Sequence, residues 1–275
     1  VTSTMACTIT AKKLCVPLVH VEAGIRSGDM SMPEEINRIV TDSICDHFFT
    51  TTKLAGALLK QSGIDDSRIH FVGNTMIDTL YQNLDRLKQP DFWDAQMLCQ
   101  GSYFLLTLHR PANVDEPAKL VEYLRAILAG TEGHKIIFPV HPRTRKSLEA
   151  VHFGDERLVQ IDPLGYLEFI YLLKSARAVI TDSGGITEEA TVLNIPCLTL
   201  RDSTERPETV EVGTNELVGT DPRDLAPYLA TLAQGKWKQG RIPELWDGRT
   251  SERIVSKLLT LFGEKPVEHL AAKDA

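Results

Sequence analysis

The sequence predicts an α/β protein with two doubly wound, Rossmann-like domains. Short apolar runs alternate with amphipathic segments along most of the 275 residues, as they do in parallel sheets covered by helices on both faces. The polar stretch 88–91, Lys-Gln-Pro-Asp, interrupts this alternation and is the linker that we predict between the domains. Open sheets of this kind bind ligands at the carboxyl ends of their strands, so we expect a ligand in the cleft between the domains.

The expected elements follow from the spacing of the apolar residues. Strands are expected at 17–21, 47–50, 69–72, 103–108, 135–140, 158–161, 177–181 and 197–200. Helices are expected at 4–14, 34–45, 53–63, 75–87, 117–129, 143–150, 165–174, 186–193, 222–233 and 250–262.

The domain division follows from these elements. Too few strands precede residue 75 to fill a doubly wound sheet, and the chain opens on a helix with no strand before it. We therefore expect residues 1–87 to be the remaining part of a first, incomplete domain, as in an N-terminally truncated chain. Residues 88–249 should form a complete second domain, and 250–275 a C-terminal helix that returns toward the first.

Composition excludes several classes of protein. A content of 43% hydrophobic and 24% charged residues is ordinary for a globular chain, and a net charge of −7 argues against a nucleic-acid partner. No apolar run approaches the roughly 18 residues of a membrane span. The five cysteines are scattered, with no C-x-x-C pair, which indicates reduced thiols in a cytoplasmic protein and no zinc site.

The stretch 181–189, Thr-Asp-Ser-Gly-Gly-Ile-Thr-Glu-Glu, follows an expected strand and opens an expected helix. This layout presents free backbone N–H groups to a phosphate. We expect Ser183 to cap the helix, and Gly184 and Gly185 to let the backbone approach an anion closely. A carboxylate one turn into the helix is placed for a ribose diol, although Glu188 and Glu189 also simply suit the helix dipole. The loop predicts a nucleoside diphosphate that carries a sugar.

Glu22 follows the expected strand 17–21 and so lies at the ligand edge of its sheet. The alternative without a functional role is a surface ion pair with Arg26, which would contribute little to stability. Glu34 has a stronger structural alternative, because Ser31-x-x-Glu34 matches a capping box with Pro33 in the first turn. Glu34 and Arg38 also have the spacing of a helix-surface pair. Spacing alone therefore favours Glu34 as a cap, with its neighbour Glu35 solvated.

Three further strand ends carry polar residues. His109 and Arg110 follow strand 103–108, and a histidine there can carry a proton near neutral pH or bind phosphate. The stretch 141–145 is expected at the rim of the cleft or at the entry to a helix. Arg206 is expected to clamp a diphosphate or to reach the sugar, unless it pairs with Glu205 or Glu208. A Ser183-His109-Asp182 triad is discounted because the nucleophile-elbow spacing is missing.

Five blocks in these regions resemble the UDP-N-acetylglucosamine 2-epimerase family of the non-hydrolysing type. They are HVEAGIRSGDMSMPEEINR, VGNTMIDTL, TLHRPANVD, DSGGITEEA and RDSTERPETVEVGT, in the family's order between residues 20 and 214. The resemblance implies a GT-B-like fold with UDP in the cleft, a homodimer, and no metal or nicotinamide cofactor. It also implies interconversion of UDP-GlcNAc and UDP-ManNAc, or of a 2-acetamido analogue, by anti elimination of UDP and re-addition.

The resemblance assigns roles to single residues and reverses the capping interpretation of Glu34. By motif, the implied catalytic residues are Glu22, Glu34 and His109, the last near the diphosphate. The implied substrate-binding residues are Arg38, the β-phosphate loop Ser183-Gly184-Gly185, the ribose-binding Glu189, Arg206, and, at the uracil, Phe169 and the backbone of Leu164.

Two departures from the family pattern keep other functions open. The family's catalytic aspartate, expected just before the segment that matches Val1, and its N-terminal Gly-rich loop are absent from this sequence. Residues 111–113 also lack the charged residues that the family links to allosteric substrate binding, so we do not expect that regulation. The alternatives are a hydrolysing 2-epimerase that releases ManNAc and UDP, a GT-B glycosyltransferase, and a chain that binds UDP without catalysis.

Overall fold

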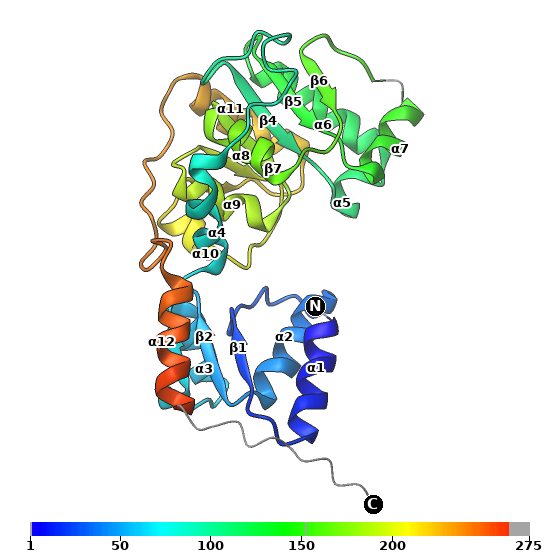
Figure 1. Cartoon of the computed structure of the whole chain (residues 1–275). Coiled ribbons are helices and arrows are strands. Elements are labelled where there is room, and N and C mark those ends of the chain that lie inside the picture. The colour runs from blue at the N-terminus through cyan, green and yellow to red at the C-terminus, as the bar shows by residue number, and fades with distance from the viewer. Residues whose placement is uncertain (1, 152, 264–275) are drawn as a thin grey trace, which may run out of the picture.

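The computed structural model describes residues 2–151 and 153–263. Two parallel sheets lie one above the other in Figure 1, with three strands in the lower and six in the upper. The predicted α/β class is therefore confirmed. Residues 264–275, the end of the segment predicted to return toward the first domain, lie outside the described residues.

The smaller sheet contains β1 (Val19–Val21), β2 (His47–Thr50) and β3 (Ile69–Phe71), in the order β1-β2-β3. Its helices are α1 (Thr2–Lys13), α2 (Pro33–Ile44) and α3 (Lys53–Gln61), and the 3-10 turn η1 (Asp66–Arg68) leads into β3. A small core of Ala23, Cys45, Phe48 and Leu59 joins the sheet to its helices. This unit places the ends of β1 and β2 toward the larger sheet (Figure 1).

The larger sheet has the doubly wound order β6-β5-β4-β7-β8-β9, with every pair parallel. Its strands are β4 (Tyr103–Thr107), β5 (Lys135–Pro139), β6 (Leu158–Ile161), β7 (Ala178–Thr181), β8 (Cys197–Thr199) and β9 (Asn215–Leu217). The chain starts at β4, moves outward through β5 and β6, and then continues on the other side from β7. The strand order therefore reverses between β4 and β7, which is where sheets of this kind hold their ligands.

Helices cover both faces of the larger sheet. One face carries α6 (Pro117–Gly130), α7 (Pro142–Val151) and α11 (Leu225–Ala233), and the other carries α4 (Thr75–Asn83), α8 (Tyr166–Ser175) and α9 (Gly184–Val192). The remaining elements are α5 (Pro111–Val114), α10 (Pro207–Glu211), α12 (Thr250–Phe262) and the 3-10 turns η2 (Leu84–Arg86) and η3 (Pro222–Asp224).

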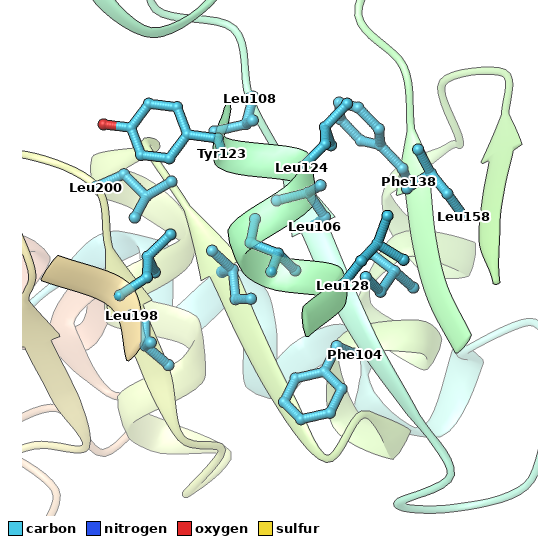
Figure 2. Packing of buried hydrophobic residues seen from close by; sticks show 14 of the residues in the cluster. Phe104, Leu106, Leu108, Tyr123, Leu124, Leu128, Phe138, Leu158, Leu198 and Leu200 are labelled. Atoms are coloured by element: carbon cyan, nitrogen blue, oxygen red, sulfur yellow. The ribbon is translucent and has the colours of Figure 1, made fainter. Parts of the chain in front are cut away.

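Alternating side chains explain why this sheet is buried on both faces. Phe104 and Leu106 of β4 face α6, whereas Tyr103 and Leu105 face α4 and α8. Figure 2 shows Tyr123, Leu124 and Leu128 of α6 packed over the first of these faces. Burying a large apolar side chain contributes roughly 1.5–3 kcal/mol, so this core fixes the positions of the strand ends.

The chain crosses between the two sheets twice. Helix α4 packs Ile77 and Leu80 into the core of the larger sheet, although it precedes the predicted linker 88–91. The return passes through Trp246 to α12, which lies beside β2, with the rings of Phe262 and His47 5.9 Å apart (Figure 1). The domain boundary at residue 88 stays a prediction.

Where the chain first crosses between the sheets, just before α4, the backbone at position 73 requires glycine. Gly73 has a φ of +105°, and a Cβ there would lie 2.2 Å from the carbonyl oxygen of Leu245 on the returning segment. The two crossings thus touch backbone to backbone. None of the helices in the described residues is long and apolar enough to cross a membrane.

The contact at Gly73 gives a test of this crossing. Gly73→Ala should lower the free energy of unfolding by more than about 3 kcal/mol, because left-handed strain adds to an overlap that backbone atoms cannot relieve. Gly63→Ala is the matched control: its φ is +88° with nothing within 4 Å of the added Cβ, so a loss of about 1–2 kcal/mol is expected. Urea unfolding measures both, and equal losses would contradict the close approach.

Candidate active site

The two sheets enclose a cleft of about 640 Å³ at the carboxyl ends of their strands. Residues from both units line it: Glu22, Met32, Glu34, Arg38, Met76, His109, Arg110, Pro111, His141, Arg143, Gly184, Gly185, Glu188, Glu205 and Arg206. Seven of the predicted site residues meet here, namely Glu22, Glu34, Arg38, His109, Gly184, Gly185 and Arg206. The expectation that residues 141–145 contribute to the rim holds for His141 and Arg143.

The predicted phosphate loop connects β7 to α9. Helix α9 begins at Gly184, and Ser183 occupies the N-cap position. The Ser183 side chain makes no capping hydrogen bond, so the expectation that it caps the helix is wrong. The first-turn N–H groups of a helix have no intrahelical acceptors, and the helix dipole favours negative charge beside them. The start of α9 can therefore hold a phosphate.

Asp182 and His109 meet where β4 and β7 end side by side. The imidazole Nδ1 of His109 lies 2.7 Å from Oδ1 of Asp182, which is fully buried. Asp182 also accepts hydrogen bonds from the backbone N–H groups of His109 and Arg110 and from Asn113. Burial acts to raise the pKa of Asp182, but the contacts with His109 and these backbone groups hold it below its ordinary value. An ionised Asp182 keeps the proton of His109 on Nδ1 and leaves Nε2 for the cleft.

A buried arginine connects the two sheets. Arg206 Nη2 lies 3.3 Å from Glu22 Oε2, its Nη1 donates to Thr51 Oγ1 at 3.3 Å, and its Nε pairs with Glu188. Burial alone would lower the pKa of Arg206, but the charges of Glu188 and Glu22 raise it. The predicted alternatives for Arg206, pairs with Glu205 or Glu208, are not formed.

Glu188 completes this cluster from the side of α9. Its side chain is buried, and Asn74 at the start of α4 donates to it at 3.0 Å. Burial raises the pKa of Glu188 to about 7, against the opposing charge of Arg206. From the sequence, Glu188 is one of two first-turn carboxylates that suit the helix dipole or a ribose, and neither interpretation predicts its contact with Arg206. The signal in the sequence is the position of Glu188 one turn after the Gly184-Gly185 pair.

Glu22 is held in an unusual backbone conformation. Its φ is +63°, in the left-handed region that a residue other than glycine occupies at a cost. Thr75 Oγ1 donates to Glu22 Oε1 at 3.0 Å, and Arg206 holds the other carboxylate oxygen. The predicted alternative, a pair with Arg26, is wrong, because Arg26 pairs with buried Asp42 at 2.6 Å. Strain of this kind persists where surrounding contacts hold it, as they do here.

The environments of the two neighbouring glutamates of α2 differ from those expected. Glu34 is exposed and lines the cleft, whereas Glu35 is buried and accepts hydrogen bonds from Ser27 and Gly28. The capping box is not formed, because Met32 is the N-cap and Ser31 bonds to Asp29 instead. The local interpretation of Glu34 as a cap and Glu35 as solvated is therefore wrong, and Glu34 is free to act in the cleft.

Arg38 does not pair with Glu34, its predicted partner. Its Nη1 lies 3.6 Å from Glu35 Oε2 rather than near Glu34. This nitrogen is buried and makes no hydrogen bond. An arginine nitrogen without an acceptor beside a polar cleft is suited to a ligand oxygen.

Four predicted site residues are not among those that line the cleft, namely Ser183, Glu189, Leu164 and Phe169. Glu189 is buried, and its pKa is raised to about 7 by burial, with the Tyr166 hydroxyl hydrogen-bonded to it. Leu164 and Phe169 are partly buried against the core beside α8. Ser183 is partly exposed at the N-cap of α9. Their roles at ribose, uracil and phosphate stay predictions.

Within residues 2–151 and 153–263, no group of three His, Cys, Asp or Glu side chains is placed to hold a metal ion. The cleft instead gathers carboxylates, a histidine paired with an aspartate, and arginines around a helix N-terminus. Such a set can move protons and stabilise a leaving diphosphate.

Comparison with known proteins agrees with this geometry. The family model described as UDP-N-acetylglucosamine 2-epimerase matches residues 1–259. The chain belongs to this family. The 2-epimerase of Methanocaldococcus jannaschii is 42% identical over 269 residues, covering 93% of this chain and 72% of that protein. The UDP-2,3-diacetamido-2,3-dideoxy-D-glucuronate 2-epimerase of Pseudomonas aeruginosa is 40% identical, covering 94% and 72%.

Solved structures of the family share this fold. The M. jannaschii UDP-GlcNAc 2-epimerase in complex with UDP-GlcNAc and UDP has a TM-score of 0.76 at 40% identity, covering 92% of this chain and 73% of that one. The Neisseria meningitidis enzyme bound to UDP-GlcNAc has a TM-score of 0.84 at 28% identity, covering 94% and 74%. The fold that the resemblance implied for this 2-epimerase family member is confirmed.

The Asp182–His109 contact yields one prediction. Asp182→Asn should lower kcat by up to about 100-fold and remove the preference of His109 for a proton on Nδ1. Imidazole ¹⁵N shifts report the tautomer, and His134, whose Nδ1 lies 2.8 Å from the Thr131 carbonyl, is the internal control. An unchanged tautomer together with unchanged kcat would show that Asp182 does not orient His109.

Glu189 yields a second prediction, on stability. Its folded pKa of about 7 exceeds the reference value of 4.5, so the folded state binds more protons between these pH values. The contribution of Glu189 to stability therefore falls as the pH rises from about 4.5 to 7. Glu189→Gln should match the parent protein near pH 4 and exceed it at pH 8 by on the order of 3 kcal/mol. Urea unfolding across this range measures the gain, and a difference constant with pH would refute it.

Proposed function

We propose that this protein is a non-hydrolysing UDP-N-acetylglucosamine 2-epimerase that interconverts UDP-GlcNAc and UDP-ManNAc. The observation that carries the proposal is the meeting of Glu22, Glu34 and His109 with the start of α9 in one cleft. The proposal is supported by 42% identity to the M. jannaschii enzyme over most of the chain. It is also supported by the likeness to structures that hold UDP-GlcNAc.

The first half-reaction is an elimination. A carboxylate takes the proton from C2 of the sugar, the electrons of that C–H bond form the C1–C2 double bond, and the C1–O bond breaks. UDP leaves with the electron pair of that bond, and the second half-reaction reverses these steps with protonation on the other face of C2. The reaction therefore needs acid–base groups near C2 and a cradle for the departing diphosphate.

Carboxylates on the smaller sheet supply the proton transfers in this scheme. Glu22 follows β1 and is fixed by Arg206 and Thr75, whereas Glu34 enters the cleft from the first turn of α2. We assign both to acid–base catalysis at C2. The two side chains come from different segments, as a reaction on two faces of one carbon requires.

The larger sheet supplies the site for UDP. The free N–H groups at Gly184 and Gly185 receive the β-phosphate, and His109, oriented by Asp182, donates a hydrogen bond or a proton to it. Arg38 and Arg206 supply positive charge nearby. We place the ribose at Glu189 and the uracil at Phe169 and the backbone of Leu164, beside α8. Stabilising the leaving group in this way is the larger contribution to the rate.

Isotope exchange tests the proposed reaction. Incubation with UDP-GlcNAc in D₂O should place deuterium at C2 of both sugar nucleotides, because the C2 proton leaves and returns from solvent. Glu22→Gln and Glu34→Gln should each lower the exchange rate by roughly 100-fold or more, with UDP affinity changed only a few-fold. NMR and calorimetry provide these readouts.

Several outcomes of the same experiment would reject the proposal. Full turnover with hydrogen retained at C2 excludes the elimination. Net release of free ManNAc and UDP identifies a hydrolysing epimerase, and dependence of turnover on an added acceptor identifies a glycosyltransferase. UDP binding without exchange identifies a chain that only binds the nucleotide.

A second substrate has a specific observation in its favour. The P. aeruginosa relative acts on a 2,3-diacetamido glucuronate and is 40% identical to this chain, nearly as similar as the M. jannaschii enzyme. The exchange experiment should therefore be repeated with that sugar nucleotide. The substrate with the higher kcat/KM is the one for which the enzyme is specific.

We also propose a cytoplasmic homodimer. The family resemblance implies the dimer, and all five cysteines are free thiols in the structure, as expected for a reducing compartment. Sedimentation velocity across a dilution series tests the dimer. A monomer at micromolar concentration would reject it.

A further inference from the structure

One helix carries both the phosphate site and the partner of Arg206. Gly184 and Gly185, at the start of α9, line the cleft, and Glu188 follows one turn later with its carboxylate on Arg206. A turn of helix is rigid on this scale, because its hydrogen bonds fix each residue to the one four places away. The position of the phosphate site therefore determines the position of Glu188.

Arg206 then connects this helix to the other sheet. Its guanidinium lies 3.3 Å from Glu22 and 3.3 Å from Thr51, which follow β1 and β2 respectively. Glu22 has the left-handed backbone conformation, so its contacts decide where its carboxylate points. The path from Glu188 through Arg206 to Glu22 is thus continuous and made of charged contacts.

The chemistry of Glu188 indicates more than a stabilising role. Its side chain is only 3% exposed, and a buried ion pair is weak evidence for stability because the desolvation of both charges offsets their attraction. A carboxylate at this position does one thing that an apolar side chain cannot. It fixes the guanidinium that Glu22 also contacts, with Asn74 holding the carboxylate itself at 3.0 Å.

We propose that Glu188 is a positioning residue that couples the UDP site on α9 to the catalytic carboxylate Glu22 through Arg206. The proposal rests on the 2-epimerase activity proposed above. Its consequence is that UDP bound at α9 holds Glu22 in a fixed position relative to the phosphate site until UDP adds back to the unsaturated sugar. Without the coupling, Glu22 loses its fixed position and re-addition fails more often, so more turnovers end in release of UDP and the unsaturated sugar.

The test is Glu188→Gln, which keeps the size of the side chain and removes its charge. We expect kcat to fall by about 10- to 100-fold, whereas the Kd for UDP measured by calorimetry stays within about threefold of the parent value. The share of turnovers that end in free UDP and unsaturated sugar, measured by NMR, should rise. A purely structural role predicts neither the separation of kcat from Kd nor this leakage.

Asp78→Asn is the matched control. Asp78 is also a buried carboxylate that joins distant segments, since it accepts hydrogen bonds from Thr250 and Ser251 at the start of α12. None of these three residues lines the cleft. This variant should lower the thermal midpoint while kcat stays at the parent value.

Each result decides the proposal. Glu188→Gln with parental kcat and no added UDP release would overturn the coupling while the epimerase assignment stands. Equal losses of kcat and UDP affinity would overturn it in favour of a direct binding role. Absence of deuterium exchange in the parent protein would overturn the epimerase assignment and the coupling with it.

Discussion

The buried charge of Arg206 is the constraint on which the arrangement of the two sheets depends. A guanidinium that is removed from water requires partners on several sides. The smaller sheet supplies Glu22 and Thr51, and the larger supplies Glu188. Neither sheet alone satisfies this cation. The cleft between them is therefore held at a defined width by an interaction that lies in the cleft itself, and the acid–base residues and the phosphate site face each other across it.

The winding of the larger sheet supplies the rest of the site. Because the strand order reverses between β4 and β7, the segments that follow these strands diverge and leave room for a ligand. His109 and Asp182 follow these two strands and meet there at 2.7 Å. Their contact joins residues 73 positions apart, and it depends only on topology and on the residue type at each strand end. The family membership of the chain agrees with this arrangement.

The sequence predicted buried elements well and the pairing of charges poorly. Strands 47–50 and 158–161 have the predicted bounds, because each is a short, mainly apolar run between polar segments. Strand β9 was missed because Asn215-Glu-Leu217 is short and largely polar. The capping box failed at Glu34 because local spacing does not show which of two adjacent glutamates faces inward. Arg26 and Arg206 pair with residues distant in the sequence, because tertiary contacts decide the partners of buried charges. Arg38 pairs within its helix, but with Glu35 instead of Glu34. Motif resemblance implies a catalytic role for Glu34, and its place in the lining of the cleft is compatible with that role, which stays a prediction.

The contact between the two crossings also bears on how the chain folds during synthesis. Thr51 accepts a hydrogen bond from Trp246 at a separation of 195 residues, and Val72 accepts one from Arg253 at 181. Contacts between residues so far apart in the chain form late and slow folding. The smaller sheet would thus leave the ribosome before α12, the helix that lies beside β2. During that interval its apolar surface is open to aggregation, so the demand on chaperones should fall mainly on the segment that carries the smaller sheet and decrease when α12 emerges.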